Sequence, residues 1–313
     1  MDADRSVEGS PPSRTGVAAA LTTTAGVATA AGSALPSGGG GGGVARATRV
    51  IDAIIAPILL AAGIILFFFP GNTHALWAWT IKPNMSALTM GAGYLGGVWF
   101  FTRAFFDRNP YRVVGGLAAA SPFTALLLIA TILHWKLFNH SHVSFFAWLI
   151  LYGVTPVLLP ILAIGNWRER CQAAVPEPVL PSRLRAALGV VGGFQVLVAL
   201  FWIIAPHAVI PHWPWKITPL SLRSVSSFVV FTGLMLAWPL VDPRRGAVRY
   251  GFEAVLIGLS LTGVAALRAH DELNGPTASV VGFSVSLVLI LILVSAALVT
   301  ISRAPEHAAA ASH

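Results

Sequence analysis

The chain has 313 residues, of which 56% are apolar and only 10% are charged, and its formal net charge is +8 at pH 7. An ordinary soluble domain carries roughly 25% charged residues, so this composition excludes a water-soluble globular protein and indicates a chain surrounded by lipid. The single cysteine, Cys171, excludes an internal disulfide and a thiolate metal cage.

The segment 1–48 differs from the rest of the chain, because it consists mostly of Ala, Gly, Thr and Ser and ends in a run of glycines at 38–43. Such a segment has no aromatic side chain to bury and cannot offset the entropy cost of becoming ordered. It predicts a disordered cytoplasmic tail, and its apolar part is too rich in Thr and too far from residue 1 for a cleaved signal peptide. We expect a second disordered tail at 304–313.

Apolar runs follow from residue 49 onward, each long enough to cross a hydrocarbon layer about 30 Å thick, which needs roughly 20 residues of helix. Backbone amides in lipid need internal partners, which selects helices, and the alternating strands of a membrane β-barrel are not found. The sequence therefore predicts an all-α polytopic membrane helical bundle with eight transmembrane helices, near residues 50–69, 86–106, 112–135, 143–165, 184–205, 222–241, 247–267 and 279–302.

An internal repeat is visible in the heptapeptide WAWTIKP at 77–83, which returns as WPWKITP at 213–219, an offset of 136 residues. The same offset relates Pro70 to Pro206 and His134 to His270. The helices therefore divide into two four-helix repeats, at 49–167 and 184–303, joined by a cytoplasmic linker at 168–183. Because each repeat has an even number of spans, both enter from one side, as parallel repeats related by an axis along the membrane normal.

Lysine and arginine are unevenly distributed over the predicted loops. Fifteen of the twenty lie on one side, which collects both termini and the loops near 103–112, 168–185 and 244–249. Positive residues mark the cytoplasmic side, so we expect a multi-pass protein of the cell inner (plasma) membrane with cytoplasmic N- and C-termini. The net charge then reflects topology and contact with anionic lipid headgroups. No basic platform with interleaved aromatic residues points to nucleic acid.

The repeated tryptophans, Trp77, Trp79, Trp213 and Trp215, fall in extracytoplasmic loops after the first helix of each repeat. Trp is amphipathic and prefers the headgroup zone of a bilayer. The simpler interpretation is a set of interfacial anchors that fix helix tilt. The alternative is that these side chains form the aromatic walls of an outward-facing cleft between the repeats, where they would contact a substrate or a partner.

The stretch FFFPGNTHALWAWTIKPNMSALTMGAGYLGG at 67–97 carries a resemblance. A helix end with Pro is followed by an aromatic-Trp-x-Ile-x-Pro turn and a helix of small residues. This stretch resembles a segment of uncharacterised multi-pass membrane proteins of actinobacterial type, with a weaker similarity at 206–230. The resemblance implies the same multi-pass architecture, and no assigned activity accompanies it.

Histidines gather near the predicted extracytoplasmic face, and His134, His140 and His142 of the first repeat could converge with His270 of the second. Imidazoles are ordinary ligands of Zn²⁺ and Cu²⁺, so one hypothesis is a metal site that joins the repeats. Histidines also titrate near pH 6.5 and could sense external acidity. The third interpretation is a set of ordinary loop histidines.

Ionisable residues inside the predicted spans are few, and they mark function more often than other residues do. Asp52 and Glu253 lie within one or two turns of the cytoplasmic end, and Glu253 is the deeper of the two. Glu253 could serve transport, but the simpler explanation is pairing with Arg249 one helical turn earlier.

Sequence motifs of common catalytic sites are not found, which favours a non-enzymatic protein. We therefore expect an integral membrane protein with an outward-facing Trp- and His-rich surface and no cofactor. Two alternatives stay open, namely a small-molecule or ion transporter with its site between the repeats, and an extracytoplasmic metal-binding or pH-sensing protein.

Overall fold

A computed structural model describes residues 41–107, 109, 111–170 and 177–303. The described residues from Gly43 onward belong to one compact unit, and the fold described below lies within it. The first helix begins at Gly41, ahead of the expected boundary at 48. The rest of the expected N-terminal tail, the tail at 304–313 and Cys171 lie outside the described residues.

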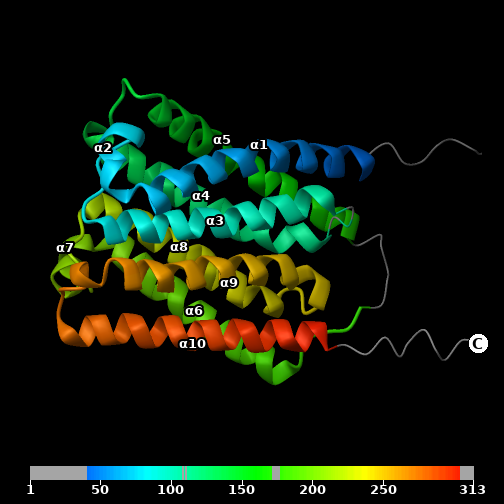
Figure 1. Ribbon diagram of the computed structural model, residues 1–313. Coiled ribbons are helices and arrows are strands. Elements are labelled where there is room, and N and C mark those ends of the chain that lie inside the picture. Colours follow the sequence, from blue (N-terminus) through cyan, green and yellow to red (C-terminus); the bar gives the residue numbers. More distant parts are fainter. Residues whose placement is uncertain (1–40, 108, 110, 171–176, 304–313) are drawn as a thin grey trace, which may run out of the picture. The chain divides into compact units, whose positions relative to one another are not determined.

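Long helices dominate the described residues, in agreement with the predicted all-α class (Figure 1). The long helices are α1 (Gly41–Phe68), α3 (Asn84–Phe106), α4 (Tyr111–Leu133), α5 (Val143–Arg170), α6 (Ser182–Ile204), α8 (Pro219–Ala237), α9 (Arg245–Arg268) and α10 (Thr277–Ser302). Short helices and 3₁₀ turns connect them at α2 (Thr73–Leu76), α7 (Pro206–Val209), η1 (Pro70–Asn72), η2 (Trp135–Leu137), η3 (Ile210–His212), η4 (Trp238–Leu240) and η5 (His270–Glu272).

Seven of these helices within the described residues are long and apolar enough to cross a membrane, namely α1, α4, α5, α6, α8, α9 and α10. The eighth expected span corresponds to α3, which is rich in small and polar residues and does not reach that level of hydropathy. Its buried positions include Ser86, Gly91 and Gly96. The chain is therefore a multi-pass membrane protein by its helices, and α3 is suited to contact with protein rather than lipid.

Four helices form the interior of the bundle and four cover it. α3 packs against α9, and α4 packs against α8 and α9, while α5, α6 and α10 pack against α4, α8 and α9 respectively. The covering helices α1, α5, α6 and α10 present exposed apolar side chains, among them Ile54, Ile64, Ile150, Ile161, Phe194, Leu197, Leu289 and Ile292. Apolar surface of this extent on four helices fits contact with lipid.

Glycines allow helices of the bundle to cross closely. A Cβ added at Gly192 of α6 would lie 2.4 Å from the carbonyl oxygen of Gly233 in α8. A Cβ added at Gly96 of α3 would lie 2.5 Å from the carbonyl oxygen of Ala254 in α9. Small residues at such crossings are typical of helix pairs in membranes, where packing replaces the hydrophobic driving force.

The bundle has two ends, where the helices are connected (Figure 1), and their residues differ in composition. We call the end that carries α2 and α7 the tryptophan end, comprising residues 69–83, 134–142, 205–218 and 269–276. The opposite end, where α1 begins and α10 ends, is the arginine end, comprising residues 103–112, 177–185 and 241–249. The functional candidates fall at these two ends.

Candidate functional site

At the tryptophan end, the first Trp-x-Trp segment is enclosed by aromatic side chains. Trp77 and Trp79 are only 5% and 4% exposed. The ring of Trp79 lies 4.9 Å from Trp148 of α5 and 5.0 Å from Phe138, measured between centroids. Trp77 lies 5.7 Å from the same Trp148 ring and 6.2 Å from Tyr94 of α3. These separations are those of favourable edge-to-face aromatic pairs.

The second Trp-x-Trp segment is enclosed in a similar way. Trp213 lies 4.9 Å from Trp202 of α6 and 5.3 Å from Trp215, and Trp215 lies 5.5 Å from Phe283 of α10. Trp213 and Trp215 are 7% and 2% exposed. The indole N–H of Trp215 donates a hydrogen bond of 2.9 Å to the hydroxyl of Ser86 in α3.

These positions correct the expectation that the four tryptophans anchor the protein in the headgroup zone, because all four are buried in protein. One main-chain hydrogen bond attaches each Trp-x-Trp segment to a neighbouring loop. The N–H of Asn139 donates to the carbonyl of Ala78 at 2.8 Å, and the N–H of Gly275 donates to the carbonyl of Pro214 at 2.9 Å. Ala78 and Pro214 are the residues between the paired tryptophans, so the loop before α5 holds the first segment and the loop before α10 holds the second. We call each of these two hydrogen bonds a clamp.

The histidines of the predicted metal site do not assemble, so that prediction is wrong for the described part of the chain, where no three His, Cys, Asp or Glu side chains group as metal ligands. His134 accepts from Arg223, and His142 bonds the carbonyl of Ala75. His140 lies against the rings of Trp135 and Phe145, and His270 bonds the carbonyl of Leu267. Each imidazole ring therefore bonds to or packs against its own neighbours, and the four rings do not face a shared centre.

Two arginines at this end cap helices, a role that sequence reasoning missed. Arg268 of α9 donates to the carbonyl of Phe67 at 2.7 Å, and Arg223 of α8 donates to the carbonyl of Ile203 at 3.1 Å. Phe67 and Ile203 occupy the last turns of α1 and α6, where unpaired carbonyls favour a cation. The 136-residue offset relates Phe67 to Ile203 but does not relate the two arginines, so the sequence pattern did not indicate this role.

Arg223 also contacts His134, with its guanidinium 2.7 Å from Nε2. Nε2 must therefore accept, which requires the neutral ring with its proton on Nδ1. Burial lowers the pKa of His134, and the nearby charge of Arg223 lowers it further. His134 is thus uncharged near neutral pH in this arrangement.

The arginine end is held by polar side chains from several elements. Asp107, just after α3, accepts from the hydroxyl of Tyr250 at 2.5 Å and from Arg112 at 3.2 Å. Burial by itself would raise the pKa of Asp107, but the hydrogen bonds from Tyr250 and the N–H of Asn109, with the charge of Arg112, lower it below its usual value. Tyr111 in turn donates to Glu177. This network ties α3, α4 and α9 to the segment before α6.

Glu253 of α9 lies at the crossing of α9 and α3. It accepts from Arg249 at 2.8 Å, the pairing expected one helical turn apart, and from the indole N–H of Trp99 at 2.9 Å. Arg103 of α3 lies 3.8 Å away. Glu253 therefore joins two helices that are far apart in sequence, a contact the sequence did not indicate.

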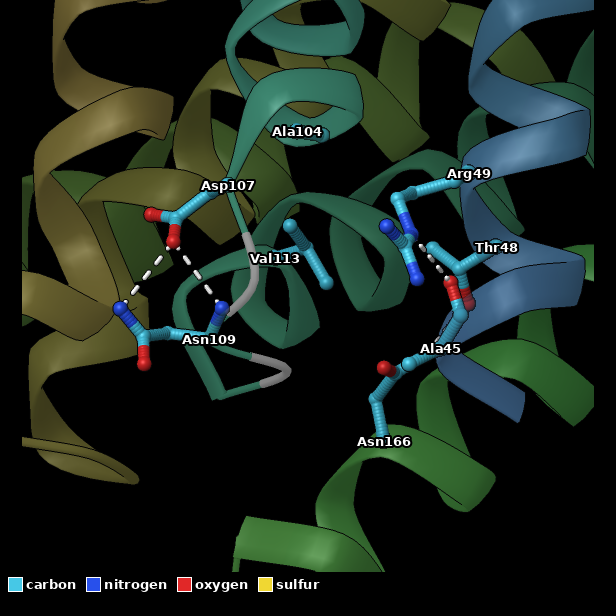
Figure 2. Close-up of a pocket in the computed structure, with 8 residues that line it drawn as sticks. All are labelled: Ala45, Thr48, Arg49, Ala104, Asp107, Asn109, Val113 and Asn166. Carbon is cyan, nitrogen blue, oxygen red and sulfur yellow. Dashed lines mark hydrogen bonds between the residues drawn. The ribbon is translucent and has the colours of Figure 1, made fainter. Parts of the chain in front are cut away.

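Asp52 of α1 is fully buried, at 0% exposed, and neither of its carboxylate oxygens has a hydrogen-bond partner. Thr48, one turn earlier, lines a cavity of about 20 Å³ beside Arg49 and Asn166 (Figure 2). The wall is completed by Ala45, Ala104, Asp107, Asn109 and Val113. A volume of this size holds about one water molecule.

Comparisons of the chain with protein-family models, with curated proteins and with solved structures found no match.

Proposed function

We propose that the chain is a non-enzymatic integral membrane protein of the cell inner membrane, with eight spans in two parallel four-helix repeats and both termini in the cytoplasm. Its role is that of a membrane scaffold with a closed extracytoplasmic surface. The tryptophans lie beneath that surface, and the exposed histidines His74, His140, His207, His212 and His270 form part of it. The arginine end then faces the cytoplasm and contacts anionic headgroups.

The observation that carries this proposal is the pair of main-chain hydrogen bonds at the tryptophan end, from Asn139 to Ala78 and from Gly275 to Pro214. Asn139 and Gly275 are 136 residues apart, and so are their acceptors Ala78 and Pro214. Main-chain hydrogen bonds at matching positions support a duplicated four-helix unit. They also close both loops over the bundle, which favours a fixed surface over an open cleft.

Helix packing supports the same division. If α1, α3, α4 and α5 correspond to α6, α8, α9 and α10, a two-fold axis exchanges the contact of α3 with α9 and the contact of α4 with α8. Both contacts are present, and α4 also meets its counterpart α9. An axis parallel to the helices exchanges these pairs, as parallel repeats require.

A transporter with its site between the repeats is the second candidate, and the position of Glu253 favours it. This carboxylate contacts Trp99 across the α3–α9 crossing, which is the boundary between the proposed repeats. A transporter requires that Glu253→Gln or Trp213→Ala abolishes uptake of a solute by vesicles. If no solute of a broad panel shows counterflow, the scaffold function is favoured over the transporter.

The topology is tested with single cysteines in a Cys171→Ser background. Ala75 and Ser182 are both exposed, at the tryptophan end and the arginine end respectively. We expect an impermeant maleimide to label Ala75→Cys in whole cells, and Ser182→Cys only after the cells are opened. Labelling of both in whole cells, or of Ser182→Cys alone, contradicts the proposed orientation.

A further inference from the structure

We propose that Asp52 is a proton-binding site that exchanges its proton with water through the small cavity at the arginine end. This inference does not depend on the proposed scaffold role, because it rests on the surroundings of one side chain. Asp52 is fully buried in α1, both of its oxygens are unpartnered, and a cavity wall begins one helical turn away at Thr48.

An ionised carboxylate buried without a partner is far more costly than a neutral acid. Asp52 therefore needs either a proton or a bound cation. The charged groups that line the adjacent cavity are Arg49 of α1 and Asp107 at the end of α3, while α4 and α5 contribute the uncharged Val113 and Asn166.

Neither charged group serves as the partner of Asp52. Arg49 donates its Nε proton back to the carbonyl of Ala45, and Asp107 is engaged by Tyr250 and Arg112. Within the described residues Asp52 also has no second and third His, Cys, Asp or Glu side chain with which to hold a metal ion. A proton is therefore the ligand that the surroundings of Asp52 admit.

The route for the proton is short and polar. Residues four apart on a helix are about 6 Å apart along its axis, so Thr48 and Asp52 share a face with one turn between them. The hydroxyl of Thr48 donates to the carbonyl of Val44 and accepts from Nδ2 of Asn166 at 2.8 Å, and Oδ1 of Asn166 is buried without a partner. A water in the cavity can bond these groups. When it arrives as a hydronium ion, one of its O–H bonds breaks, the proton forms an O–H bond on a carboxylate oxygen of Asp52, and a neutral water is left.

Infrared spectroscopy of the full chain in lipid vesicles tests the proposal directly. We expect a carboxylic-acid carbonyl band at neutral pH, shifted in protein made with carbon-13-labelled aspartate and lost in Asp52→Asn. The band should persist in Glu253→Gln, which alters an ion-paired carboxylate, and in Arg49→Gln. Thr48→Val should slow exchange of the acid proton when the vesicles are moved into D₂O.

Two outcomes overturn the inference. One is a spectrum without an aspartic-acid band at neutral pH, which the isotope label detects in the unaltered protein even if Asp52→Asn fails to fold. The other is a band that appears or grows in Arg49→Gln, which would mean that Arg49 keeps Asp52 ionised in the natural protein.

Discussion

At the scale of single residues, Trp79 and Trp215 show how two related positions came to differ. Trp215 donates its indole N–H to Ser86, whereas the buried N–H of Trp79 has no hydrogen-bond partner. The position 136 residues after Ser86 is Leu222, which has no side-chain acceptor. The proposed two-fold relation between the repeats would account for both the bond and the unpaired group.

The two tryptophans make a matched pair for mutation. Trp215→Phe removes the partner of a buried hydroxyl, while Trp79→Phe removes an N–H that already lacks one. We expect Trp215→Phe to reduce the free energy of unfolding by about 1–3 kcal/mol more than Trp79→Phe. Denaturant unfolding in detergent micelles measures the difference, and equal losses would contradict the assigned hydrogen bond.

His134, at the tryptophan end, makes the stability of the folded protein depend on pH. Its folded pKa is lowered by burial and by Arg223, so the folded state binds fewer protons than the unfolded state. Stability from this residue is present above the unfolded value of about 6.5 and is lost as the pH falls through it. We expect melting temperature to fall between pH 7 and pH 5 in the unaltered protein, and to fall less in His134→Gln. An equal fall in both would assign the effect elsewhere.

At the scale of elements, the hydrogen bond from Gly275 to Pro214 leaves room only for glycine at position 275. A Cβ at Gly275 would lie 2.1 Å from the carbonyl oxygen of Trp213, a main-chain atom that cannot turn aside. The residue 136 positions earlier is Asn139, which carries a Cβ. The two clamps therefore have the same type of hydrogen bond, but the space around the donor residue differs.

Gly275→Ala should therefore push the Trp213 segment outward. We expect a loss of roughly 1–3 kcal/mol in the free energy of unfolding, in line with overpacking, and a red shift of tryptophan fluorescence as the indoles meet water. Gly71→Ala is the control, because Gly71 lies at the same end with nothing within 4 Å of the added Cβ. Identical spectra for both variants would mean that the segment is not held by this clamp.

At the scale of the whole molecule, the two ends are held by different forces. The tryptophan end depends on main-chain hydrogen bonds and on edge-to-face and tilted aromatic pairs. The arginine end also has ion pairs with partly exposed guanidinium groups, Arg103–Glu253 and Arg249–Glu253. Salt screens exposed charges strongly but leaves main-chain hydrogen bonds almost unaffected.

Raising the salt concentration should therefore loosen one end only. We expect hydrogen exchange in lipid nanodiscs to speed up over 103–107 and 245–253, around the exposed ion pairs, as salt rises from 0.05 to about 1 M, where the Debye length is about 3 Å. Exchange over 77–83 and 213–219 should stay constant. A uniform change along the chain would indicate that the ion pairs do not hold the arginine end.

The positions of the long helices could be predicted from the sequence, because apolar runs bounded by polar and Pro residues mark them, although α3 falls below the hydropathy of the other seven. α5 begins at Val143 and α10 ends at Ser302, as expected. The burial of the tryptophans could not, because it follows from where Asn139 and Gly275 place the loops. The predicted histidine site failed for a related reason, since closeness to one membrane face does not bring rings together.

The close fit of α3 against α9 has a consequence for how the protein is made. α3 is not apolar enough to enter a bilayer readily alone, and the helix it packs on is encoded about 140 residues later. At roughly 5–20 residues per second of synthesis, α9 follows on the order of ten seconds afterwards. During that interval the glycine-lined face of α3 must be covered by the insertion machinery or by α1. We therefore expect the first helices to be released into the membrane only late in synthesis.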